Sequence, residues 1–437
     1  MLPIKKIRFS DNYILDVVIV LLGSVVLTFF YSLLFEGLFT AQIFAATLTD
    51  SAQFAGPYVK SLTSLLISNS EFIAPALGIA MFITSILLIL LIARGIMTVL
   101  TGIGFCIAWI LLWRYPGMWT YELLFPALFA MCAGLAKITQ PLFGLSIYTQ
   151  LSISKFTKII LIFLLSVLLA YVTFLAQIHS AVSYKIAISS GLTFLVVSCI
   201  HLGIDQWLKN KNIQTKTSKT DSIWIDVMII IMGSMMVAQV YSNYYSGLYT
   251  FDGFKNLGEY YSTATASIWL SQFLSWAGNY SSILLPFFIS YEVIIAILLV
   301  LLIFRGPVTL LASGLFFLLG FAEFGVSSTW PPTSGFYNEE WELLLPAVIS
   351  LLIGIGKLEE MFRAKTWREM ILGRKIFYSL SSMSRILIAT TCAVALYFAG
   401  MVTHIFGSPY IPISISAAIT FFILLILLAW IDQYRSE

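Results

Sequence analysis

The chain has 437 residues, of which 59% are apolar and 10% are charged, and its formal net charge is +3. Soluble domains are roughly 45–50% apolar and about 25% charged, so the composition excludes an ordinary water-soluble globular protein. The small positive charge follows from loops that flank apolar segments and gives no indication of a nucleic-acid partner. The bulk of the chain is therefore predicted to lie in a lipid bilayer.

Twelve apolar stretches approach or exceed the roughly 18–20 residues that a helix needs to cross the hydrocarbon core. They are continuously apolar instead of alternating, which favours helices over a β-barrel. In chain order the predicted spans are 14–35, 72–93, 96–113, 121–138, 159–178, 184–206, 223–245, 281–304, 307–325, 341–357, 380–402 and 411–432. We therefore predict an all-α, polytopic membrane protein with about 12 transmembrane helices.

Lysine and arginine are distributed unequally between the two sides of these spans. With the amino terminus inside, only Lys60, Arg114, Lys185 and Lys255 of the 24 basic residues lie outside. Basic residues concentrate on the cytoplasmic side of membrane proteins. The first span is also too long for a cleavable signal peptide. We expect a multi-pass protein of the bacterial cytoplasmic (inner) membrane with both termini in the cytoplasm.

The second half of the sequence repeats the first. Residues 11–40 align with 221–250 and share 11 identities, whereas unrelated apolar helices would share roughly three. We predict a first six-helix repeat over 1–208, a cytoplasmic basic linker over 209–220 and a second six-helix repeat over 221–437. Because each repeat holds an even number of spans, the two should be parallel and related by a rotation of about 180° around the membrane normal.

In both repeats a long outside connection joins the first span to the second, over Glu36–Glu71 and Ser246–Ser282. Loops of this length usually contain structure of their own. Within the second connection, Ser267–Asn279 places its apolar residues on one helical face. We predict that this segment is an amphipathic helix at the outer membrane surface, parallel to the membrane plane.

Three features recur at matching positions of the two repeats. The second span is followed by Arg94 or Arg305, and the fourth begins near Glu122 or Glu342. The fourth span ends in a glycine-containing turn, Gly134-Leu135-Ala136-Lys137 in the first repeat and Gly354-Ile355-Gly356-Lys357 in the second. The cores at about 11–138 and 221–358 thus resemble the DoxX-like family of four-helix membrane proteins, which includes small subunits of thiosulfate:quinone oxidoreductase. Ala136 departs from the family, which prefers glycine there.

This resemblance implies an integral membrane subunit of a redox or stress-defence system that works with membrane or soluble partner proteins. The sequence shows no nucleophile-base motif, no metal-ligand spacing and no dinucleotide fingerprint, so no catalytic residue is assigned. His179 and His404 could pair as haem ligands, but two interfacial histidines left by duplication are the favoured interpretation. No cofactor is evident; in electron transfer, a bound quinone or a partner would supply the redox group.

The acidic residues Glu122 and Glu342 each stand four residues before a proline near a predicted helix start. A carboxylate there is stabilised by the helix dipole, which is the favoured interpretation. The alternative is a proton-relay or substrate-contact role, because ionisable groups at membrane depth are functional candidates.

A second set of charges lies at the inside ends of three spans in each repeat. Its members are one acid and two bases per repeat: Asp16, Arg94 and Lys137 in the first, and Asp226, Arg305 and Lys357 in the second. An acid at the edge of the hydrocarbon region is costly unless it is paired. We predict that each Asp contacts the Arg of its own repeat, whose planar guanidinium suits a carboxylate. The alternative is that these residues are only anchors at the membrane surface.

The sequence leaves three functions open. The leading hypothesis is an integral inner-membrane subunit of a redox or envelope-maintenance system, non-catalytic by itself and acting with a partner or a quinone. The alternative is a solute transporter of 6+6 architecture, because two parallel six-span halves also build the major facilitator proteins. A scaffold or assembly protein is the third.

Overall fold

The computed structural model describes residues 11–35, 37–53, 57–112, 124–138, 219–245, 247–264, 268–324, 339–364 and 366–372, with a few isolated residues between 156 and 203. The regular elements in these ranges are helices. In the first half they are α1 (Asp11–Phe35), α2 (Ala41–Ala52), α3 (Pro57–Ser68), α4 (Ser70–Ile89), α5 (Arg94–Leu112) and α6 (Leu124–Lys137). In the second half they are α9 (Lys219–Tyr245), α10 (Phe251–Ala264), α11 (Ile268–Asn279), α12 (Ser281–Val300), α13 (Arg305–Phe324), α14 (Glu339–Phe362) and α15 (Trp367–Leu372). The predicted all-α fold class is confirmed for this part of the chain.

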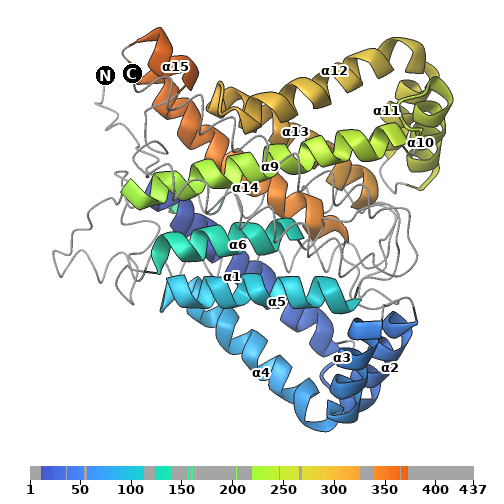
Figure 1. Ribbon diagram of the computed structural model, residues 1–437, viewed down its shortest axis with the longest axis vertical. Coiled ribbons are helices and arrows are strands. Elements are labelled where there is room, and N and C mark those ends of the chain that lie inside the picture. The colour runs from blue at the N-terminus through green and yellow to red at the C-terminus, as the bar shows by residue number, and fades with distance from the viewer. Residues whose placement is uncertain are drawn as a thin grey trace.

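Helices of the two halves meet in the middle of the molecule. In Figure 1, α4 and α5 lie on one edge, α12 on the opposite edge, and α1, α6, α9 and α14 lie between them. The helices α1 and α6 of the first half both contact α9 and α14 of the second half. The main apolar core is continuous across this interface, because it includes residues of all four central helices. The halves therefore share one core.

Eight of the predicted spans coincide with the helices α1, α4, α5, α6, α9, α12, α13 and α14. The other four, at 159–178, 184–206, 380–402 and 411–432, lie outside the described residues. The two long connections also contain structure, as predicted: α2 and α3 occupy the first, and α10 and α11 occupy the second. Ser267–Asn279 is confirmed as helical over Ile268–Asn279.

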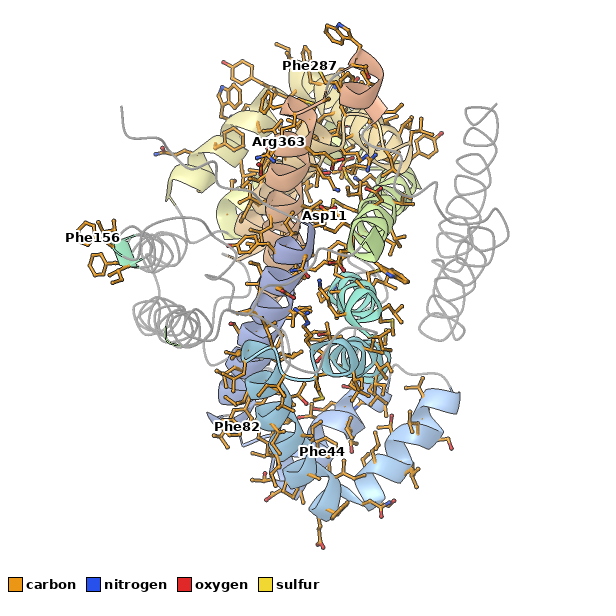
Figure 2. The ribbon with its side chains drawn as sticks, turned by 90° about the vertical axis from the view of Figure 1, so that its left-hand side faces the viewer. Asp11, Phe44, Phe82, Phe156, Phe287 and Arg363 are labelled. Atoms are coloured by element: carbon orange, nitrogen blue, oxygen red, sulfur yellow. The ribbon has the colours of Figure 1, made fainter. Side chains whose placement is uncertain are left out.

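Two of these helices, Ser70–Ile89 and the Ser281–Leu299 part of α12, have the length and apolar composition of a membrane-crossing helix. Only 28% of each such segment is buried within the protein. Phe72 of α4 and Phe287 of α12 are 78% and 70% exposed. Figure 2 shows Phe82 of α4 and Phe287 of α12 at the outer surface of the helix assembly. Large apolar side chains that are exposed along a whole helix suit a lipid environment better than water.

The first helix of each half ends in the same way. Gly37 and Gly247 have positive φ angles of 73° and 79°. The following Leu38 N–H donates to the Leu33 carbonyl, and the Leu248 N–H donates to the Asn243 carbonyl. This is the glycine-based helix stop in which a left-handed residue reverses the chain. In each half this stop turns the chain into the long connection at a matching position.

The turns from α4 to α5 and from α12 to α13 also share an unusual backbone. Leu91 and Ala93 have φ angles of 55° and 47°, and Leu302 and Phe304 have φ angles of 53° and 49°. Residues other than glycine rarely adopt this left-handed region, because Cβ crowds the backbone. Both turns end at an arginine, Arg94 or Arg305, which is the first residue of the next helix. The strained turn therefore fixes where each arginine enters the core.

Candidate functional site

The buried charges of the first half meet between α1 and α5. Arg94 Nη1 donates to Asp16 Oδ1 across 2.5 Å. Asp16 has no exposed surface, and Arg94 is 4% exposed. The predicted contact between Asp16 and Arg94 is confirmed. A buried ion pair of this kind is stable only when both charges keep their partners.

The second half contains the same pair. Arg305 Nη1 donates to Oδ1 and Oδ2 of Asp226 across 2.6 Å and 2.7 Å. Asp226 is buried on α9, and Arg305 is buried at the start of α13. The predicted contact between Asp226 and Arg305 is therefore confirmed as well. The interpretation of these arginines as surface anchors is wrong, because both are buried.

Glycine lets the lysine of each half approach its arginine. A Cβ added to Gly95 would lie 2.6 Å from the backbone of Lys137 and Ile138, and one added to Gly306 would meet the backbone of Lys357 and Leu358. Glycine is the residue that permits such close approach of two helix backbones. The start of α5 therefore abuts the end of α6, and the start of α13 abuts Lys357 within α14.

Lys137 extends this network into the other half of the molecule. Its Nζ donates to Asp221 of α9 across 3.0 Å and to Asn12 Oδ1 of α1 across 2.7 Å. The same nitrogen lies 3.9 Å from Asp16 Oδ1. Lys137 is 1% exposed. The lysine of the first half therefore joins acids from both halves.

Lys357 makes the reciprocal contact. Its Nζ lies 3.1 Å from Asp11 Oδ1 of α1 and 3.1 Å from Glu360 Oε2 one helical turn further along α14. Figure 2 shows Asp11 in the middle of the assembly, where helices of both halves come together. Each lysine thus pairs with the first aspartate of the opposite half. We call Asp16, Arg94, Lys137, Asp221, Asp226, Arg305, Lys357 and Asp11 the central charge network.

The sequence interpretation missed Asp11 and Asp221, which carry the contacts between halves. A signal was available, because Asp11 meets Asp221 when residues 11–40 are aligned with 221–250. The central charge network has four acids, Asp11, Asp16, Asp221 and Asp226, and four bases, Arg94, Lys137, Arg305 and Lys357. Glu360, which also contacts Lys357, is not counted in this network. This balance lowers the cost of burying the charges. The arrangement holds helices together, and it places no nucleophile beside a base.

The other predicted site residues are not brought into this network. Glu122, His179 and His404 lie outside the described residues. Glu342 is in the first turn of α14, but its side chain is also outside the described part, and Pro346 lies inside that helix. Among the residues that the structure describes, no group of three or more His, Cys, Asp or Glu side chains could hold a metal ion.

Comparison of the chain with protein-family models, with curated proteins and with solved structures gives no match.

The two contacts between halves should contribute unequally to stability. Asp221→Asn is expected to lower the free energy of unfolding by about 1–2 kcal/mol, because the amide cannot neutralise the buried Lys137. Asp11→Asn should cost less than about 1 kcal/mol, because the Asp11 side chain is 18% exposed and Lys357 retains Glu360. Unfolding of the purified variants in mixed detergent micelles measures both values. Equal costs, or a larger cost for Asp11→Asn, would contradict this ranking.

Proposed function

We propose that this chain is a multi-pass protein of the bacterial cytoplasmic membrane, built from two parallel six-helix repeats with about 12 spans. In this proposal it serves as the non-catalytic integral subunit of a redox or envelope-maintenance system. It would act with a membrane or soluble redox partner protein or with a bound quinone. Support for the membrane location comes from the apolar composition and from the poorly buried apolar segments Ser70–Ile89 and Ser281–Leu299.

The two reciprocal contacts between the halves, Lys137 with Asp221 and Lys357 with Asp11, favour a structural subunit over a transporter. A transporter with two such halves works by rocking one against the other around a central site. Rocking at this interface would separate buried ion pairs and leave charges without partners, at a cost of several kcal/mol each. The network therefore favours halves that keep a fixed arrangement, as in a structural subunit.

The redox or envelope-maintenance assignment rests on the resemblance of Arg94, Glu122 and Lys137, and of their counterparts, to the DoxX-like pattern. Such a subunit would offer an apolar site for a quinone or a surface for a partner. Neither needs a catalytic group on this chain.

Purification of the full chain from membranes in a mild detergent tests the proposal. The chain should remain in the membrane fraction after alkaline washing, and it should be isolated together with a stoichiometric partner protein or an extractable quinone. Isolation of the chain alone, with neither, would contradict the subunit function. Solute uptake driven by a proton gradient in vesicles containing only this chain would support the transporter instead.

A further inference from the structure

A second buried acid lies far from the central charge network. Glu292 is in the middle of α12, within the apolar Ser281–Leu299 segment, and is 2% exposed. The Tyr249 hydroxyl donates to Glu292 Oε2 across 2.5 Å, and Asn243 Nδ2 donates to the same oxygen across 3.1 Å. The acid is therefore held by α9 and by the turn that precedes α10. In the sequence, Glu292 is the only charged residue of the predicted span 281–304.

The partners of Glu292 differ in kind from those of Asp16 and Asp226. An arginine can only donate hydrogen bonds, so it holds a carboxylate in the ionised form. A tyrosine hydroxyl and an asparagine amide can each donate or accept. In the described residues, Glu292 has no Lys or Arg within ion-pair distance, and Tyr249 is its only titratable contact. Its surroundings can therefore satisfy both the ionised and the protonated carboxyl group.

The matching positions in the first half are all apolar. The two glycine stops align Asn243 with Leu33 and Tyr249 with Phe39, and the prolines Pro75 and Pro286 align Glu292 with Met81. Leu33 belongs to an apolar cluster against which Phe39 and Met81 pack. The fold thus fills this position with apolar side chains in one half and with an acid and two polar partners in the other. Packing by itself does not require the acid.

An ionisable side chain at membrane depth is costly and marks a functional site by default. Glu292, Asn243 and Tyr249 come from separate segments of the chain, and each of the three is polar where its counterpart in the first half is apolar. A single polar substitution would have left the acid without partners. The three residues therefore behave as one unit.

We propose that Glu292, with Asn243 and Tyr249, forms a proton-exchange site within the membrane-spanning part of the second half. The carboxylate takes a proton from water on the side of the molecule that carries α10 and α11. The new carboxyl O–H then donates to the Asn243 carbonyl oxygen after the amide rotates, and the hydrogen bond from Tyr249 is retained or reversed. Release of the proton to the same side restores the first arrangement. This site rests on the proposed membrane location and goes beyond the proposed subunit function.

Tyr249 is placed to link the site to the aqueous side. It is half-buried and lies in the turn between α9 and α10, four residues after the end of α9 at Tyr245. Burial and the neighbouring Glu292 carboxylate raise the pKa of Tyr249 well above its usual range. The hydroxyl therefore keeps its proton and remains a hydrogen-bonding partner throughout the pH range in which a carboxyl group titrates.

Labelling of the full chain with a hydrophobic carbodiimide tests the site, because this reagent modifies protonated carboxyl groups in apolar surroundings. Mass spectrometry of the labelled chain in liposomes should locate the label at Glu292, with a yield that falls as pH rises. Asp16 and Asp226 should stay unlabelled. Tyr249→Phe should move the midpoint of labelling upward by about one pH unit, because it removes a donor to the ionised form.

The matched control restores the residues of the first half by combining Asn243→Leu, Tyr249→Phe and Glu292→Met. This variant should lose the label and keep a melting temperature at or above that of the natural chain. Absence of label at Glu292 at every pH, or a yield independent of pH, would overturn the proposal. Protection by millimolar sodium at constant pH would also overturn it, in favour of a metal-cation site. None of these outcomes depends on a partner protein, so failure here is distinct from failure of the subunit proposal.

Discussion

Replacement of Arg94 by methionine is expected to lower the free energy of unfolding by about 3–5 kcal/mol, because it leaves Asp16 as a buried charge without its guanidinium partner. Lys137 cannot compensate, since its Nζ is 3.9 Å from Asp16 Oδ1 and is already engaged by Asp221 and Asn12. Unfolding of the purified chain in mixed detergent micelles, followed by circular dichroism, provides the measurement.

The control for this prediction removes both charges. The double variant Asp16→Leu with Arg94→Met should recover most of the lost stability, because apolar residues of similar volume can replace a buried ion pair at little cost. The equivalent variants at Asp226 and Arg305 should follow the same pattern. If Arg94→Met cost less than about 1 kcal/mol, or if the double variant were no more stable than the single one, the ion pair would not be the cause.

Substitution of Gly95 by alanine is expected to destabilise the protein by about 2–3 kcal/mol. The added Cβ would lie 2.6 Å from the Ile138 Cα and from the carbonyl carbon of Lys137. These are backbone atoms, so no side-chain rotation can relieve the clash, and the start of α5 must move away from the end of α6. That movement would also separate Arg94 and Lys137 from their acids. Thermal unfolding in detergent reports the loss.

Gly104→Ala is the matched control, because Gly104 lies in the same helix and an added Cβ there would meet no atom within 4 Å. That variant should be neutral or slightly stabilising, since alanine favours helices over glycine by roughly 1 kcal/mol. Gly306→Ala should reproduce the loss in the second half. A similar melting temperature for Gly95→Ala and Gly104→Ala would show that the close approach of backbones does not limit stability.

Among the described residues, the sequence by itself determined the eight long apolar helices and the ion pair within each half. Apolar runs of about 20 residues predict helices because any other backbone would leave its polar groups unpaired in lipid. Asp16 with Arg94, and Asp226 with Arg305, could be predicted because each buried acid needs a base and the same base recurs at a matching position. The helical segment Ile268–Asn279 in the second long connection could be predicted from its apolar face.

Only the tertiary structure decided which acid each lysine meets. Lys137 and Asp221 are 84 residues apart, and Lys357 and Asp11 are 346 residues apart, so no local pattern connects them. Their contacts depend on how α1, α6, α9 and α14 pack at the centre (Figure 1). Glu292 is a similar case, because its partners Asn243 and Tyr249 come from another helix and a turn. Helix formation is governed by residues that are neighbours in the sequence. Contacts between helices are decided by the packing of the whole chain, so the sequence alone does not show which helix a buried charge will meet.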